Sequence, residues 1–518
     1  MTDRWDVVVV GGGHNGLTAA AYLARAGRRV LVLERADRVG GAAVSAAPFP
    51  GVEARLSRYA YLVSLLPRSV VDELRLDVRL ARRRVSSYTP DPADPARGLL
   101  VADDEDATRR SFARVGAAAD HRGWTALYAG VARLARVVFP TLTKPLPTRA
   151  ELRSRVGDDA VWTALVERPL GGTVRDRIGN DLVRGVVATD GLIGTLARVD
   201  DPSLAANRCF LYHVIGNGTG HWDVPIGGMG TVAGALEAAA RRAGATIVTG
   251  AEVTAIDPDG RVTYVHGGVE RTAAGTRVLA GVAPAVLDRL CPGSAPGAAP
   301  EGAQVKVNLL VSRLPALHDA AVPPEAAFGG TLHVNECLTQ LDDAHAAALR
   351  GTVPDRLPCE VYCHSLTDPT ILAPALAGSG AHTLTVFGLQ VPGRAITRDD
   401  HDAWRARLQR SVLASLDSVL AEPVEDLLLT DAAGRPCLET RTTLDLEDAL
   451  GMPGGHIFHG PLQWPFLEDD APRDTPARRW GVATGHPRVM LCGAGAVRGG
   501  GVSGIGGQNA AMAVLEEE

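Results

Sequence analysis

The hydrophobic pattern near the start of the chain predicts a strand, a helix and a second strand in close succession. Residues 6–10 contain a continuous β-branched run, which is typical of a parallel strand buried on both faces. An alanine-rich helix is predicted over residues 15–26, with Gly27 at its C-cap position. The next apolar run covers residues 29–33 and ends at Glu34. This order is typical of the first unit of a nucleotide-binding α/β domain.

Three glycines join the first predicted strand to the helix with the spacing G-x-G-x-x-G, at Gly11, Gly13 and Gly16. In a dinucleotide-binding unit the first permits a tight turn, the second lets the backbone approach a pyrophosphate, and the third lets the helix pack closely on the strand. The helix N-terminus then faces the phosphates, and Glu34 is placed to accept hydrogen bonds from a ribose. The motif alone is weak evidence. Its flanking strands, its helix and an acid at about the expected 20 residues favour a nucleotide site over an ordinary glycine turn.

A second helix and strand pattern lies in the middle of the chain. Residues 222–256 contain a glycine cluster, a predicted helix over 231–242, and strands at 246–249 and 252–256. A strand pair is predicted over 261–278. We interpret this stretch as a return to the nucleotide domain, although an ordinary helix–strand unit explains the pattern about as well.

The other segments have a different pattern. Helices are predicted over 67–84, 109–138 and 151–166, and residues 88–106 predict turns between short strands. Later in the chain the predicted elements are a linker at 291–301, strands at 305–311, 332–335, 358–365 and 382–390, and a helix at 404–420. Strands separated by polar loops and helices suit an antiparallel sheet that carries a substrate pocket on one face.

Composition mainly excludes some classes of protein. A chain of 518 residues is long enough for two or more domains, and its formal net charge of −6 gives no electrostatic support for a nucleic-acid partner. Seven cysteines without a C-x-x-C pair argue for a reducing compartment and against a thiol-disulfide reductase. The chain starts on a predicted core strand and has no apolar run long enough to span a bilayer. We therefore expect a cytoplasmic protein, with peripheral membrane contact left open.

Two further motifs identify a resemblance. Arg38-Val39-Gly40-Gly41 directly follows the second strand, and residues 454–460 read GGHIFHG. Near the C-terminus a predicted strand at 488–492 leads into another glycine-rich turn and a helix. In these features the chain resembles phytoene desaturases and phytoene-dehydrogenase-related oxidoreductases, within the amine-oxidase-like flavoprotein superfamily. This branch includes bacterial desaturase-like proteins, and its R-x-G-G segment lies against the FAD diphosphate. The resemblance implies FAD as the cofactor.

The resemblance also implies a domain layout. The expected fold is α/β, with a Rossmann-like FAD-binding domain of the glutathione-reductase-2 type made from residues 1–70, 217–300 and 480–518. An interleaved α+β substrate domain, built on an antiparallel sheet, is expected from residues 71–216 and 301–479. The chain would then leave the FAD-binding domain twice and return to it twice.

The residues expected to hold FAD come from both ends of the chain and from one strand between them. Gly493 and Gly495 would let the backbone reach the diphosphate and ribityl chain, and the helix at Ile505 would direct its positive end at the flavin N1–C2 carbonyl. The backbone at Val253 would touch the adenine. The complete expected set is Gly11, Gly13, His14, Asn15, Gly16, Glu34, Arg35, Gly40, Gly41, Ala42, Val253, Gly493, Gly495, Gly504 and Ile505.

Three residues are candidates for catalysis. His459 lies in the family-like segment, Trp464 is a candidate pocket wall, and Arg498 is a candidate for balancing the reduced flavin or holding a substrate carboxylate. Each also has a plain structural explanation, such as a turn cap or core packing. Relatives commonly carry His-Pro where this chain has Val497-Arg498, which weighs against a carotenoid substrate. No metal site is predicted, because His456 and His459 have no third ligand at matching spacing.

The implied reaction is dehydrogenation of an apolar or amphipathic small molecule by hydride transfer to FAD. Because the sequence has no second G-x-G-x-x-G for a nicotinamide, oxygen or a quinone is the expected electron acceptor. Two alternatives stay open. One is an amine or amino-acid oxidase on the same fold, and the other is a redox-silent isomerase or binding protein, such as the prenyl-GTPase escort proteins. The sequence also leaves a homodimer open.

Overall fold

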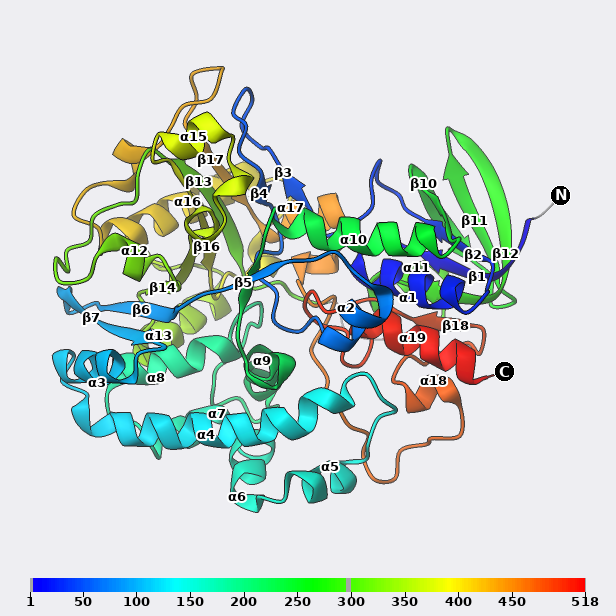
Figure 1. Cartoon of the computed structure of the whole chain (residues 1–518), viewed down its shortest axis with the longest axis horizontal. Coiled ribbons are helices and arrows are strands. Elements are labelled where there is room, and N and C mark those ends of the chain that lie inside the picture. The colour runs from blue at the N-terminus through cyan, green and yellow to red at the C-terminus, as the bar shows by residue number, and fades with distance from the viewer. Residues whose placement is uncertain (1–2, 295–299, 518) are drawn as a thin grey trace.

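Two seven-stranded sheets, one at each end of the molecule's long axis, organise the computed structural model (Figure 1). The structure describes residues 3–294 and 300–517. The linker predicted at 291–301 therefore lies partly outside the described residues, at 295–299. Among the described residues, no helix is both long enough and apolar enough to cross a membrane.

The first sheet is the expected Rossmann-like unit. Its order is β10-β11-β12-β1-β2-β9, with β18 paired to β12. β1 lies at the centre, parallel to both β2 and β12, and its residues Val7 to Val10 are buried on both faces. The strands are β1 (Asp3–Val10), β2 (Val30–Leu33), β9 (Thr246–Val248), β10 (Ala251–Ile256), β11 (Arg261–His266), β12 (Val269–Ala280) and β18 (Val489–Leu491). The strand, helix and strand predicted at the N-terminus are confirmed.

Three helices from distant parts of the sequence pack beside this sheet: α1 (His14–Arg25), α10 (Met229–Arg242) and α19 (Ile505–Glu516). α1 contacts both of the others. A Cβ atom added at Gly507 of α19 would lie 1.9 Å from the carbonyl oxygen of Asn15, so these two helices meet at their N-terminal ends. The first and last parts of the chain therefore complete one structural unit (Figure 1).

The second sheet has the order β17-β13-β16-β15-β14-β6-β7. Every pair of neighbouring strands in this sheet is antiparallel except β14 and β6, which are parallel. The sheet is therefore mixed rather than purely antiparallel. One face packs against α16 (His401–Asp417), and the other faces a helical layer that includes α8 (Asp181–Ala188). The strands are β6 (Val85–Asp91), β7 (Asp94–Ala102), β13 (Val305–Val311), β14 (Thr331–Val334), β15 (Cys359–Tyr362), β16 (His382–Gly388) and β17 (Leu438–Arg441).

The prediction of turns at residues 88–106 was wrong in part. This stretch forms the hairpin of β6 and β7, whose tight turn is held by a 3.0 Å bond from the Ala93 N–H to Asp91 Oδ1. The prolines are tolerated because β7 is an edge strand and the register shifts between Pro90 and Asp91.

The helical layer also differs in its boundaries. The helix predicted over 67–84 ends at Leu74, because Arg75 adopts a left-handed conformation with φ of 50°. Left-handed glycines likewise end α3 before α4 and α5 before α6, at Gly116 and Gly157. The helices of this part are α2 (Arg68–Leu74), α3 (Glu105–Arg114), α4 (His121–Val138), α5 (Arg149–Val156), α6 (Asp159–Trp162), α7 (Leu170–Arg175), α8 and α9 (Ala205–Val214).

Shorter elements connect the two sheets. Among them, β5 (Leu80–Arg82) pairs with β8 (Asp223–Pro225), and β3 (Ser45–Ala46) pairs with β4 (Leu56–Ser57). The remaining helices are α11 (Pro284–Leu290), α12 (Pro324–Ala327), α13 (Leu338–Leu349), α14 (His364–Thr367), α15 (Pro374–Gly378), α17 (Thr443–Leu450) and α18 (Pro476–Arg479).

Candidate functional site

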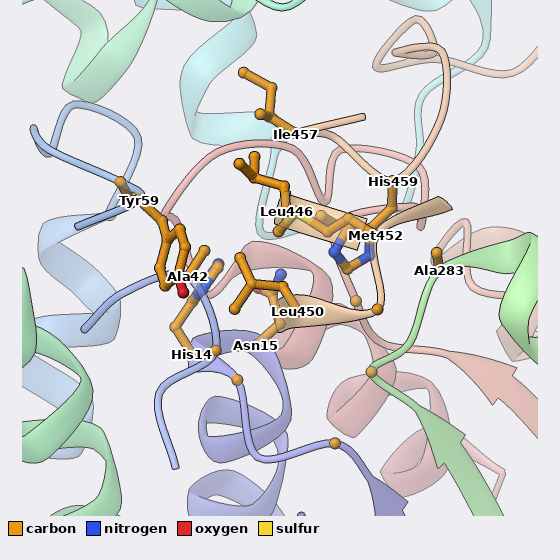
Figure 2. A pocket seen from close by; sticks show the side chains of 18 of the residues that line it. His14, Asn15, Ala42, Tyr59, Ala283, Leu446, Leu450, Met452, Ile457 and His459 are labelled. Carbon is orange, nitrogen blue, oxygen red and sulfur yellow. The ribbon is translucent and has the colours of Figure 1, made fainter. Parts of the chain in front are cut away.

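A cavity of about 590 Å³ lies where the carboxyl ends of β1, β2 and β12 approach the second sheet. It extends from residues 34–38, after β2, past the glycine turn at residues 11–16, to Lys306 on β13 and Phe387 on β16. Its size is within the usual range for a small-molecule or cofactor site. Figure 2 shows side chains from several distant segments converging on it.

Glycine occupies the three positions of the first turn for different structural reasons. Gly11 needs its φ of 99°, and a Cβ at Gly16 would lie 2.1 Å from the Gly11 carbonyl oxygen. Gly13 is different, because its φ of −68° suits any residue and a Cβ there would meet nothing within 4 Å. Gly13 lines the cavity. The fold therefore requires glycine at positions 11 and 16, whereas at position 13 glycine keeps the cavity open beside the backbone.

The nucleotide end of the cavity is formed around Glu34. Its carboxylate accepts hydrogen bonds from the N–H groups of Gly12 at 2.7 Å and Ala36 at 2.8 Å, which fixes it at the cavity wall. Val253 of β10 lines the same end. The second glycine pair lies directly against the first turn, since the Gly40 N–H donates to the Gly12 carbonyl at 2.8 Å.

The two glycine turns, distant in sequence, meet at this cavity. His14 Nε2 lies 3.1 Å from the Gly501 carbonyl oxygen, 487 residues away in sequence. Gly493 lines the cavity, and its close approach to the Gly281 carbonyl leaves no space for a side chain. The sequence-predicted residues that line the cavity are Gly11, Gly13, His14, Asn15, Gly16, Glu34, Arg35, Gly41, Ala42, Val253, Gly493 and His459.

The other predicted cofactor residues lie just outside the lining. Gly40 supports the first turn, as described above. Gly495 packs against Pro284, since an added Cβ would lie 2.4 Å from Pro284 Cδ. Gly504 is the N-cap of α19 with φ of 72°, and Ile505 is buried in the core beneath it.

Two neutral imidazoles face the cavity from opposite sides (Figure 2). Burial lowers the pKa of both His14 and His459 to about 4, and the charges of His14 and His456 add to the effect at His459. His459 has a left-handed backbone with φ of 63°, and its buried Nδ1 has no hydrogen-bond partner among the described residues. His459 thus lines the cavity and keeps one ring nitrogen without a partner among the described residues.

The structure does not bring the other two catalytic candidates to this cavity. Arg498 is 2% exposed, and its guanidinium donates to the carbonyls of Thr141 at 2.8 Å, Lys144 at 2.6 Å and Trp480 at 3.0 Å. Burial lowers its pKa to about 10. Trp464 stacks on Phe466, with ring centroids 5.7 Å apart. Arg498 is thus buried in the protein and Trp464 is half-buried beside Phe466, and neither is among the residues that line the cavity.

We expect Arg498→Met to lower thermal stability more than reactivity. The substitution removes the guanidinium donor from the carbonyls of Lys144 and Trp480 and one of two donors from that of Thr141, which costs about 3 kcal/mol or more of unfolding free energy. Denaturant unfolding measures the loss. The expected flavin reduction by the folded fraction should stay within a few-fold of wild type, and a folded variant with normal stability and no reduction would contradict this structural role.

Lys306 is a cavity residue that the sequence reasoning missed. It sits on β13, and its Nζ donates to the carbonyls of Ser57 and Tyr59, both at 2.7 Å. The Tyr61 ring centroid is 5.3 Å away. Burial lowers the pKa of Lys306 to about 7, although Glu439 opposes the shift. A signal was present, because the chain has only two lysines and this one interrupts an apolar strand.

A short segment covers the cavity on one side. Leu446 and Leu450 of α17, with Met452 and Ile457 after it, direct their side chains over the space between His14 and His459 (Figure 2). Arg35 Nη2 donates to the Ala449 carbonyl at 3.3 Å, which ties this cover to the nucleotide end. No local sequence signal marked these residues as cavity residues.

Comparison with known proteins places the chain in a family. A family model described as an NAD(P)-binding Rossmann-like domain matches residues 9–67. The uncharacterized protein Rv0897c of Mycobacterium tuberculosis is 56% identical over 521 residues, covering 99% of this chain and 97% of that protein. The chain belongs to the family of this mycobacterial protein. In Rattus norvegicus, pyridine nucleotide-disulfide oxidoreductase domain-containing protein 2 is 29% identical over 573 residues, covering 100% of this chain and 94% of that one.

Two solved structures have a fold similar to that of this chain. A redesigned putrescine oxidase has a TM-score of 0.59 at 17% identity and covers 100% of both chains. Cyclohexylamine oxidase from Brevibacterium oxydans has a TM-score of 0.55 at 17% identity and covers 99% of both. The chain thus shares its overall fold with these two oxidases. The narrower resemblance to phytoene desaturases stays a prediction.

Proposed function

We propose that the chain is an FAD-dependent oxidoreductase that dehydrogenates an apolar or amphipathic small molecule by hydride transfer to the flavin. One observation carries the proposal. A single cavity connects the two glycine turns and Glu34 with a chamber on the second sheet where Lys306 is buried. A site that only bound a nucleotide would not need the second part of this cavity.

The residues present fit FAD. Gly13 leaves the backbone open at the N-terminus of α1, where N–H groups and the helix dipole favour a diphosphate. Among the described residues, Asn15 Oδ1 and His459 Nδ1 are buried without a hydrogen-bond partner, so polar atoms remain for a ligand. Glu34 and Val253 would hold the ribose and adenine, and Gly41 and Gly493 the region of the diphosphate.

The chamber at the far end supports an apolar substrate. Its wall includes the side chains of Tyr61, Ile193, Trp222, Phe387 and Phe458. Aromatic and aliphatic walls bind a substrate through burial of apolar surface, and a few polar groups then orient it. Lys306 Nζ lies 5.3 Å from the centroid of the Tyr61 ring in this wall.

In the proposed mechanism FAD supplies the hydride acceptor when bound. Lys306, with a pKa near neutrality, is the group that accepts the substrate proton. Its neutral amine has two N–H groups, both used on the carbonyls of Ser57 and Tyr59, which leaves the lone pair free. Leu446 and Leu450 exclude water from the same space.

Anaerobic reduction tests the proposal. The purified protein should be yellow with one flavin per chain, and a terpenoid or other apolar substrate should bleach the flavin without oxygen. Readmitted oxygen or a quinone should restore the colour. A colourless protein that refuses added FAD would indicate a redox-silent binding protein, and turnover without flavin reduction would indicate an isomerase.

Amine oxidation is the second candidate function. Tyr59 and Tyr61 both line the cavity next to Lys306, an arrangement that suits a neutral amine approaching an apolar wall. An amino-acid substrate has less support, because Arg58 at the cavity is already paired with Glu439. Flavin bleaching by primary amines, and its absence with hydrocarbons, would favour this candidate over the first.

A further inference from the structure

A buried cluster of acids and one histidine lies on the second sheet, among residues that do not line the cavity. His333 on β14 and Glu360 on β15 are direct cross-strand partners, so their side chains share the face that looks toward the helical layer. Glu336 follows two residues after β14. We call His333, Glu336 and Glu360 the sheet triad.

The geometry of the sheet triad is that of a ligand set. One ligand atom from each residue lies within 4.8 Å of the other two, and all three residues are buried. The imidazole is held in place, since His333 Nδ1 lies 3.1 Å from Thr89 Oγ1. Glu360 is likewise oriented by bonds from Thr189 Oγ1 at 3.2 Å and from the Tyr362 hydroxyl. Oriented ligands of this kind are typical of metal sites.

Glu336 supplies the independent observation. It is 0% exposed, and neither of its carboxylate oxygens has a hydrogen-bond partner among the described residues. Asn335, immediately before it, has a left-handed backbone with φ of 56° that directs the chain into the interior. An ionised carboxylate in this position is very costly unless a cation lies against it.

A third acid and one guanidinium lie next to the sheet triad. Glu360 and Asp190 are both close enough to Glu336 to interact with it electrostatically, and Arg83 interacts in the same way with Glu360. Three carboxylates with one guanidinium leave two negative charges uncompensated when all are ionised, which a divalent ion would balance.

We propose that His333, Glu336 and Glu360 bind one divalent first-row transition-metal ion. One imidazole and two carboxylates are ligands that suit Zn²⁺, Mn²⁺ or Fe²⁺. The ion would join β14, β15 and the loop before α13, and so hold this face of the sheet against the segment after α8 that carries Thr189. No metal site was predicted here, because the ligands at 333, 336 and 360 match no metal motif.

Metal content and thermal unfolding test the proposal with the full chain. Protein stripped with a chelator and then titrated with Zn²⁺ or Mn²⁺ should bind about one ion per chain, and its Tm should rise with metal concentration. This readout is independent of flavin content and activity. Absence of binding and of any Tm shift with Zn²⁺, Mn²⁺ and Fe²⁺ at pH 8 would overturn the proposal and leave protonated acids as the explanation.

Matched variants identify the ligands. Glu336→Gln keeps the side-chain shape and removes a buried charge, so the metal-free variant should be at least as stable as metal-free wild type while metal affinity falls about 100-fold or more. His333→Gln should lose affinity similarly. His345→Gln is the control, because His345 is also buried and has one 3.1 Å side-chain partner, Gln390. Equal metal binding by all three variants would overturn the assignment.

Discussion

Replacing Gly13 with valine is expected to abolish flavin binding while the fold stays intact. The backbone at Gly13 already has a conformation that valine accepts, and among the described residues, apart from its two chain neighbours, none has an atom within 4 Å of the position of its Cβ. The new side chain would project into the cavity beside the N-terminus of α1, where the diphosphate is proposed to lie. We expect FAD affinity to fall by about 100-fold or more, which is ~2.7 kcal/mol. Flavin absorption after gel filtration measures cofactor binding. The Tm of the flavin-free protein, compared with wild type at equal metal content, measures whether the fold is intact.

Two neighbouring substitutions make this result specific. Gly16→Val should disrupt the fold itself, because even a Cβ would lie 2.1 Å from the Gly11 carbonyl oxygen. Gly234→Val should change neither property, since Gly234 is exposed on α10 and a Cβ there would meet nothing within 4 Å. Undiminished FAD binding by folded Gly13→Val would show that the diphosphate does not pass this turn.

Replacing Lys306 with methionine is expected to slow flavin reduction by about 10²- to 10⁴-fold, the usual contribution of a general base. In the wild type, the rate should fall as pH drops below about 7, where the Lys306 amine becomes protonated. Lys306→Arg should also be slow, because a guanidinium stays protonated over this range. Anaerobic stopped-flow reduction at several pH values measures both effects.

The stability of the Lys306 variants supplies a separate check. The pKa of Lys306 is about 7 in the folded protein against an ordinary 10.5, so the unfolded chain binds more protons between these values. The free energy of unfolding should therefore rise as pH increases from about 7 to 10.5, and Lys306→Met should lack this rise. A variant that loses the pH-dependent stability but reduces flavin at the wild-type rate would make Lys306 a structural residue.

The sequence predicted the parts of the site that depend on local backbone geometry. The turn at Gly11, Gly13 and Gly16, with Glu34 at the end of the next strand, is encoded within one strand–helix–strand unit. Its spacing alone therefore indicates what it does. The glycine turn at Gly493 was found for the same reason, and the structure brings the two turns together.

The parts that failed depend on long-range packing. Arg498 lies within the C-terminal glycine-rich segment. Its side chain nevertheless points away from the cavity and donates to the carbonyls of Thr141 and Lys144, in the segment after α4. Lys306 stands out in the sequence as a rare lysine within an apolar strand, but its role depends on the carbonyls of Ser57 and Tyr59, some 250 residues earlier, which lie beside it. Such contacts form between segments whose proximity no local pattern determines.

The contact between His14 and Gly501 has a consequence for biosynthesis. The two turns are 487 residues apart, and the cavity is incomplete until both are present. At ordinary translation rates the ribosome needs about 25 to 100 s to travel this distance. The first glycine turn of a nascent chain therefore lacks the rest of the cavity for most of its synthesis. Capture of the proposed flavin would then be one of the last events in maturation.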